Sequence, residues 1–131
     1  MLAKSDLRKI SKARLSDAAA LRRARKYDGA VYLCGYAVEI ALKARICRTL
    51  RWSGWPDSKG EWACCASLKT HSLDVLLRFS GVEDRIKTDF FAEWSAVAQW
   101  DPETRYKAVG HATKEDALLM IASARRLVRI L

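Results

Sequence analysis

The feature that most constrains this fold is residues 27–52, YDGAVYLCGYAVEIALKARICRTLRW, the most apolar long segment of the chain. Between Gly29 and Leu42 the only charged residue is Glu39. A helix that is apolar nearly all round is usually buried at the centre of a protein, and this segment is too long for one strand. We therefore predict a central helix over residues 29–50, with Asp28 as its N-cap.

One line of polar residues interrupts this apolar helix. Tyr32, Tyr36, Glu39 and Lys43 are spaced so that they share one helix face. An unpaired carboxylate in apolar surroundings is costly, so we expect Glu39 to pair with Lys43 or Arg105. Two interpretations stay open. The line is a half-exposed stripe whose tyrosine hydroxyls meet water, or it directs Glu39 to a functional cleft or a subunit partner.

The rest of the chain is predicted to cover this helix. Helical patterns occupy residues 5–26, 72–80, 82–100 and 114–131, and no segment alternates like a strand. The short connection at 26–29 favours an antiparallel pair for the first two helices. We predict an all-α fold, with residues 1–131 as one domain. It should be an up-and-down bundle of four main helices plus a short one. The tryptophans of the loop at 53–70 are expected to pack on the core, with stacking on bases or a partner as the alternative.

Charge is distributed unevenly along the chain. The 24 lysines and arginines exceed the 15 carboxylates by nine, and residues 1–52 carry all of this excess. A one-sided basic surface is typical of proteins with a polyanionic partner, although basic helical proteins without such a partner also exist. A nucleic acid is therefore a candidate partner. No apolar run approaches the ~20 residues of a membrane span, and the charged N-terminal segment is unlike a secretory signal. We expect no membrane association and a cytoplasmic location.

The four cysteines, Cys34, Cys47, Cys64 and Cys65, include no C-x-x-C pair. Without a secretion signal we expect reduced thiols. A metal site made of Cys64, Cys65 and His71 is conceivable, but its spacing matches no zinc pattern. We therefore predict neither a metal nor another cofactor.

Three segments together resemble the HEPN family. They are YDGAVY followed by GYAVEIALKA in residues 27–44, THSL at residues 70–73, and Arg105-Tyr106 before the last helix. The resemblance covers most of the chain, and the segment in the central helix is its most specific part. It implies a small helical bundle, commonly a homodimer, and the aromatic residues near the loop and the fourth helix also favour dimerisation. Many HEPN domains are ribonucleases of toxin–antitoxin, CRISPR and phage-defence systems, and others are non-catalytic partners of nucleotidyltransferases.

Catalytic HEPN members carry an arginine, four to six residues, and then a histidine. Here five residues separate Arg105 from His111. By this resemblance Arg105 would hold the scissile phosphate, since a guanidinium matches phosphate oxygens. His111 would move the proton of the ribose 2′-hydroxyl, as histidines commonly do. Tyr106 stands where catalytic relatives often have a small polar residue. In a purely structural interpretation, Arg105 caps carbonyls or pairs with Glu39, and Tyr106 packs on the core.

Two functions are predicted. The first is a non-catalytic or weakly catalytic module that binds RNA, a nucleotide or a nucleotidyltransferase partner in a toxin–antitoxin or defence-type system. The alternative is a metal-independent endoribonuclease that uses Arg105 and His111. His71 is expected to form a local hydrogen-bonded turn, and as a site residue it would have to lie near His111. The predicted supporting or binding residues are Tyr32, Tyr36, Glu39, Lys43, His71 and Tyr106.

Overall fold

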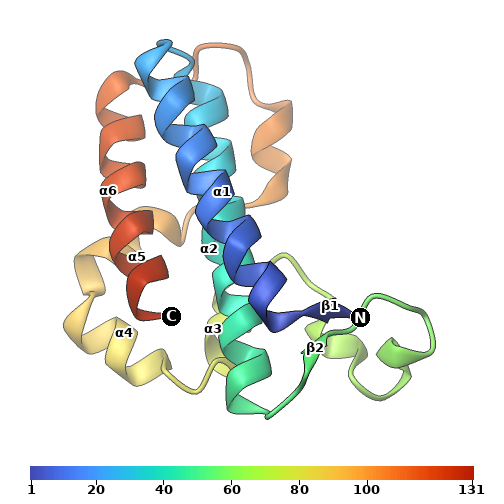
Figure 1. Ribbon diagram of the computed structural model, residues 1–131. Helices are drawn as coiled ribbons and strands as arrows, with labels where there is room; N and C mark the ends of the chain where they lie inside the picture. Colours follow the sequence, from blue (N-terminus) through green and yellow to red (C-terminus); the bar gives the residue numbers. More distant parts are fainter.

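The computed structural model describes all 131 residues and is mostly helical, which confirms the all-α prediction (Figure 1). Three long helices, α1 (Lys4–Arg23), α2 (Tyr27–Thr49) and α6 (Lys114–Ile130), pack against one another. The shorter elements are α3 (Leu73–Phe79), α4 (Glu83–Asp89), α5 (Phe91–Val97), η1 (Glu61–Cys64), η2 (Ala66–Leu68) and η3 (Pro102–Tyr106). Strands β1 (Leu2–Ala3) and β2 (Gly54–Trp55) pair antiparallel. None of the helices combines the length and apolar character of a membrane span.

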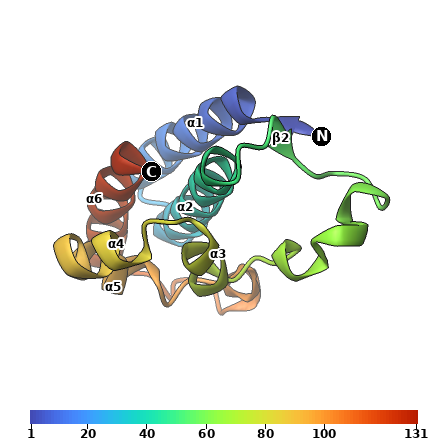
Figure 2. The ribbon, with the colours of Figure 1, turned by 90° about the horizontal axis from the view of Figure 1, so that it is seen from below.

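Helix α2 lies at the centre of the molecule, as the apolar segment predicts. Figure 2 shows it between α1, α6 and α3, and it contacts all three. Its side chains at Cys34, Val38, Leu42 and Ile46 are fully buried, and burial raises the pKa of the Cys34 thiol to about 12. The side chain of Ser11 on α1 donates to the α2 backbone at 2.7 Å, which satisfies a buried hydroxyl between the two helices.

The ends of α1 and α2 differ from the predicted ends. Each helix is followed by an arginine in the left-handed region, Arg25 (φ 60°) and Arg51 (φ 58°). The next amides, of Lys26 and Trp52, donate 2.8 Å bonds back to carbonyls five residues earlier, as in a Schellman motif. This motif ends α1 at Arg23 and lets α2 begin at Tyr27. The predicted N-cap is wrong, because Asp28 lies inside the first turn of α2 and no side chain caps that helix.

The predicted helix over residues 82–100 is also wrong, because the chain bends at Phe90 (φ −129°, ψ 34°) and forms α4 and α5. The bend lets Ile86 of α4 and Val97 of α5 both reach the core, where each is almost fully buried. Arg126 of α6 covers the Phe90 ring at 5.8 Å and pairs with Glu93. The molecule thus has three long and three short α-helices instead of four main helices and one short helix.

The loop at 53–70 is fixed to the core by its aromatic side chains. Trp55 is buried, and the Trp62 ring meets it edge-on with centroids 5.5 Å apart. Trp52 lies 6.3 Å from the same ring. The prediction that these tryptophans pack onto the core is therefore confirmed.

A close contact holds the segment after α5 against α2. The Trp100 indole lies on Gly35, where an added Cβ would come within 2.1 Å of the ring. The indole Nε1 donates to the Tyr32 carbonyl at 3.1 Å, so the buried ring is both packed and hydrogen-bonded. Gly35 thus lets the Trp100 ring lie directly on α2. The connection at 101–112, which follows Trp100, therefore starts beside the first half of α2 (Figure 1).

We expect Gly35→Ala to destabilise the fold by about 1–3 kcal/mol, because the new methyl displaces the indole ring from a packed site. This cost outweighs the gain of about 1 kcal/mol that alanine brings to a helix. Urea denaturation of both proteins measures the difference.

Gly60→Ala is the matched control, since a Cβ there meets nothing within 4 Å and Gly60 has an ordinary φ of −68°. It should leave the midpoint unchanged or raise it slightly. Equal stability of Gly35→Ala and wild type would show that the indole contact is not tight.

Candidate functional site

Asp28 anchors the far end of the 101–112 connection. Its Oδ2 accepts the Gly110 amide at 2.7 Å, and its Oδ1 accepts the Ala112 amide at 2.9 Å. Gly110 has a φ of 84°, which glycine adopts readily and other residues rarely do. The two backbone hydrogen bonds, and to a lesser degree His111, lower the pKa of Asp28. The connection that carries Arg105 and His111 is therefore held at both ends against α2.

The geometry around His111 defines its tautomer. Nδ1 lies 3.1 Å from the Ala108 carbonyl oxygen and 3.4 Å from Asp28 Oδ1. Both neighbours are acceptors, so the proton is on Nδ1. In the neutral imidazole Nε2 therefore carries the lone pair, and this atom is buried without a hydrogen-bond partner. The histidine is thus oriented by a carboxylate and a carbonyl, with its basic nitrogen covered.

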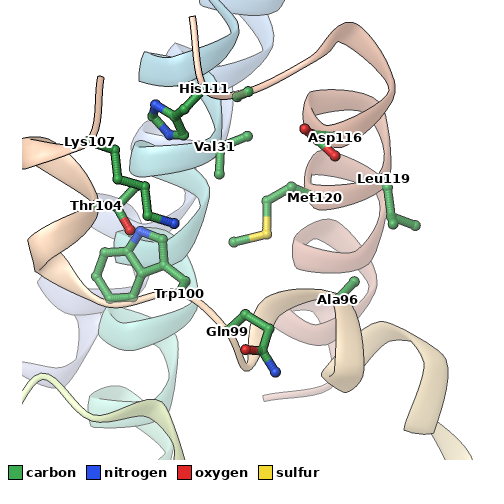
Figure 3. A pocket seen from close by; sticks show the side chains of 11 residues that line it. Val31, Ala96, Gln99, Trp100, Thr104, Lys107, His111, Asp116, Leu119 and Met120 are labelled. Carbon is green, nitrogen blue, oxygen red and sulfur yellow. The ribbon is translucent and has the colours of Figure 1, made fainter. Parts of the chain in front are cut away.

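His111 lines a cavity of about 280 Å³ between the connection and helices α2, α5 and α6 (Figure 3). The side chains of Trp100, Thr104, Lys107 and His111 form one wall, and Met120 of α6 lies on the other side. The walls are of mixed polarity, and the side-chain nitrogens of Lys107 and His111 are the basic groups among them.

Arg105 and His111 share a second hollow, of about 250 Å³, with Asp28, Tyr32 and Lys107. The Arg105 guanidinium lies 4.8 Å from the centre of the Tyr106 ring, and its side chain is 43% exposed. Interaction with the phenols of Tyr106 and Tyr32 raises the pKa of Arg105. The structure therefore brings together the two residues predicted as catalytic, the exposed Arg105 and the half-buried His111, whose side chain is 22% exposed.

Tyr32 lines this hollow, and Tyr36 lies next to it, one turn further along α2. Their hydroxyl oxygens are 3.4 Å apart and their rings meet edge-on. This hydrogen bond, with partial burial, raises the pKa of Tyr36 to about 12, so the phenol stays neutral near pH 7. The Tyr36 ring also lies 4.9 Å from Trp100. Both phenols are thus parts of a packed aromatic group at the start of the connection.

Glu39 forms a separate cluster further along α2. Only 2% of its side chain is exposed, and its Oε1 lies 2.7 Å from Lys43 Nζ and 2.9 Å from His71 Nδ1. The predicted pairing with Lys43 is confirmed, and the alternative pairing with Arg105 is not formed. The prediction that His71 takes part in a local hydrogen-bonded turn is wrong for its side chain. The imidazole instead contacts the carboxylate of Glu39, which is 32 residues away in the sequence.

The two histidines belong to different sites. His111 lies beside Asp28, and His71 lies beside Glu39, which is eleven residues or about 16 Å further along the helix axis. His71 therefore does not join Arg105 and His111. Tyr106 is 73% exposed, so the suggestion that it packs on the core is also wrong. Cys64, Cys65 and His71 form no cluster of metal-ligating side chains.

Sequence reasoning missed three residues of the site, Asp28, Thr104 and Lys107. Thr104 and Lys107 flank the Arg105-Tyr106 pair in the sequence. This position beside the motif could have indicated that they belong to the site. Asp28 was interpreted as a helix cap, because its partners are 82 and 84 residues away and no local pattern reveals them.

Comparison of the chain with protein-family models, curated proteins and solved structures finds no match. The resemblance to HEPN domains therefore depends on the segments of this chain quoted above.

We expect Asp28→Asn to lower the melting temperature at pH 7 by several degrees, because the amide nitrogen cannot accept the second backbone hydrogen bond. The pKa of Asp28 is lowered in the folded state, so its carboxylate stabilises the fold above the ordinary aspartate value of about 4. That contribution is lost as the pH falls through the lowered pKa.

Melting temperatures from pH 2.5 to 7 should therefore converge for wild type and Asp28→Asn at the acid end. Asp89→Asn serves as the control, since Asp89 is exposed at the end of α4 and its side chain forms no ion pair or hydrogen bond. A constant difference across this pH range would contradict the role of the Asp28 carboxylate.

Proposed function

We propose that this protein is a HEPN-like, non-catalytic module that binds RNA and holds a backbone phosphate at Arg105. The observation that supports this most is the half-exposed Arg105 guanidinium, which shares a hollow with Lys107, Tyr32 and His111. A guanidinium oriented by neighbouring rings can bind two phosphate oxygens at once. Lys107 adds a second positive charge to the same hollow.

Tyr106 suits an RNA base beside that phosphate. Its ring is 73% exposed and already stacks with the Arg105 guanidinium. Single-stranded RNA is commonly bound by stacking of bases on aromatic rings next to basic side chains. Arg105 and Tyr106 would thus hold one nucleotide by its phosphate and its base.

The covered Nε2 of His111 favours binding over cleavage. This atom is inaccessible to solvent and has no hydrogen-bond partner. A general base must come within hydrogen-bonding distance of the hydroxyl that it deprotonates. A ribose hydroxyl would reach Nε2 only after the side chains around His111 had moved.

The second candidate function, endoribonuclease activity, is favoured by the fixed tautomer of His111. With Nδ1 protonated by its contacts to Asp28 and Ala108, Nε2 is the nitrogen able to take a proton. In this reaction Nε2 takes the 2′-hydroxyl proton, the 2′-oxygen bonds to phosphorus, and the 5′-oxygen leaves and is protonated. The products are a 2′,3′-cyclic phosphate and a 5′-hydroxyl, with Arg105 stabilising charge on the phosphoryl oxygens.

The proposal also includes two binding partners, both based on the HEPN resemblance. They are a second copy of the chain and a nucleotidyltransferase in a toxin–antitoxin or defence-type system. Val109 and Leu119, which are 99% and 60% exposed, place apolar surface beside the site that a homodimer would cover.

The test is binding and cleavage of labelled single-stranded RNA by wild type, Arg105→Lys, Arg105→Ala and His111→Ala. For the binding module, we expect no cleavage by any variant, tenfold or greater weakening for Arg105→Ala, and weakening for Arg105→Lys, since an ammonium cannot replace the bidentate fork. Binding should also weaken with salt.

Cleavage by wild type that falls on the order of 10²–10⁴-fold in His111→Ala would establish the second candidate. Parallel reactions with chelator determine whether a metal ion takes part, and light scattering of the same samples tests the homodimer. Unchanged RNA affinity in Arg105→Ala would remove Arg105 from the site and contradict the proposal.

A further inference from the structure

Three sulfur-containing residues from distant parts of the chain border one cavity beside the N-terminus. This cavity has a volume of about 510 Å³, and its lining residues include Met1, Cys64 and Cys65. It shares no residue with the hollow at Arg105. The inference that follows therefore does not depend on the proposed function.

The thioether of Met1 is held at this cavity by the pairing of β1 with β2. The antiparallel pair brings the N-terminus next to the start of the loop at 53–70 (Figure 2). The Met1 sulfur lies 3.1 Å from the Ser53 hydroxyl, and a Cβ added to Gly54 would come within 3.2 Å of it. The N-terminal amine is held as well, because it pairs with Asp57 at 2.8 Å. The Met1 sulfur is thus a donor with a defined position.

The two thiols reach the same cavity at the break between two short helices. Cys64 ends η1, and at Cys65 the backbone leaves the helical region (φ −143°, ψ 35°) before η2 begins. Both residues border the cavity, and both are free thiols. The Cys65 sulfur lies 3.5 Å from the Glu61 carbonyl oxygen, and the Glu61 carboxylate lies 3.7 Å from the Met1 amine. Glu61 therefore joins the segment that carries the thiols to the segment that carries the thioether.

Sulfur is the main donor type that this cavity offers to a ligand. The carboxylate of Glu61 is engaged by its own loop, because its Oε2 accepts the amides of Asp57 and Ser58 at 3.1 Å each. These backbone hydrogen bonds lower the pKa of Glu61 to about 2. No histidine borders the cavity, and no third histidine, cysteine or carboxylate joins the two thiols in a metal-binding group. The thioether of Met1 is therefore the third ligand available to an ion held by the thiols.

We propose that Cys64, Cys65 and Met1 form a binding site for Cu(I), with two thiolates and one thioether as the ligands. Soft thiolate and thioether sulfurs select Cu(I) over the ions that prefer imidazole or carboxylate ligands. Each thiol gives up its proton when it binds the ion, so the site with Cu(I) carries one net negative charge. The positive charge of Arg51, which borders the same cavity, balances it.

An ion between the two sulfurs also suits adjacent cysteines better than a disulfide does. Consecutive Cα atoms are about 3.8 Å apart, which is closer than the separation that disulfides prefer. A bound ion leaves the sulfurs apart and needs no such approach. Cys64 is exposed, so the ion can enter the site from solvent.

The test is titration of the reduced protein with Cu(I) in the absence of oxygen, in competition with a Cu(I) chelator of known affinity. We expect wild type to bind one ion per chain. Loss of an outer partner of a metal ligand commonly costs about 10–100-fold in affinity, so Cys64→Ser and Cys65→Ser should each cost about 100-fold or more. Neither thiol belongs to the buried core, so both variants should fold. Cys47→Ala is the matched control, because it removes a buried thiol that does not border the cavity.

Selenomethionine labelling tests the third ligand. Met1 and Met120 are the two methionines of the chain, so Met120→Leu leaves selenium at Met1 alone. X-ray absorption at the selenium edge should show a copper neighbour in the labelled Met120→Leu protein. The same spectrum should show none after the further changes Cys64→Ser and Cys65→Ser.

Cu(I) affinity of wild type equal to that of the double variant Cys64→Ser/Cys65→Ser would overturn the proposal. Binding that depends on the cysteines but shows no copper neighbour at selenium would exclude Met1 and overturn the three-sulfur site. Arg105→Ala should bind Cu(I) as wild type does, so failure of this site and failure of the Arg105 site give different results.

Discussion

The contact of the Trp100 indole with Gly35 is the constraint on which the candidate site depends. It requires a glycine in the middle of α2, because any side chain there would occupy the ring position. The indole also uses the Tyr32 carbonyl as its acceptor, so the ring is fixed in orientation as well as depth. The connection that follows Trp100 must therefore start beside the first half of α2, where Tyr32 and Asp28 meet it.

The two carboxylates of α2 have parallel roles. Asp28 binds the amides of Gly110 and Ala112, and Glu39 binds His71 together with Lys43. Each carboxylate thus ties a segment distant in the sequence to an otherwise apolar helix. A buried or half-buried carboxylate is stable only with such partners. The apolar residues of α2 therefore require that other segments cover this helix. Its two carboxylates determine where two of these segments, those with His71 and with Gly110, lie along it.

Much of the fold could be predicted from local patterns. The apolar segment located α2 at the centre, and the helical pattern over residues 114–131 located α6, which spans Lys114–Ile130. Contacts between residues far apart in the sequence could not be predicted from local patterns. The bend at Phe90 depends on what Ile86 and Val97 meet in the core, and the anchoring by Asp28 depends on residues more than 80 positions away. The i to i+4 pair of Glu39 and Lys43 was predicted because both residues lie on one helix, whereas His71 reaches Glu39 only through the tertiary fold.

The central claim is that Arg105 binds a phosphate in the hollow that it shares with an oriented His111, and NMR of the two histidines tests it most directly. The chain has only His71 and His111, and His111→Ala assigns their ¹⁵N signals. We predict the Nδ1-protonated tautomer for His111. A short single-stranded RNA should shift its signals in wild type far more than those of His71, and should not shift them in Arg105→Ala. An Nε2-protonated His111, or signals that do not respond to RNA while His71 does, would contradict the account.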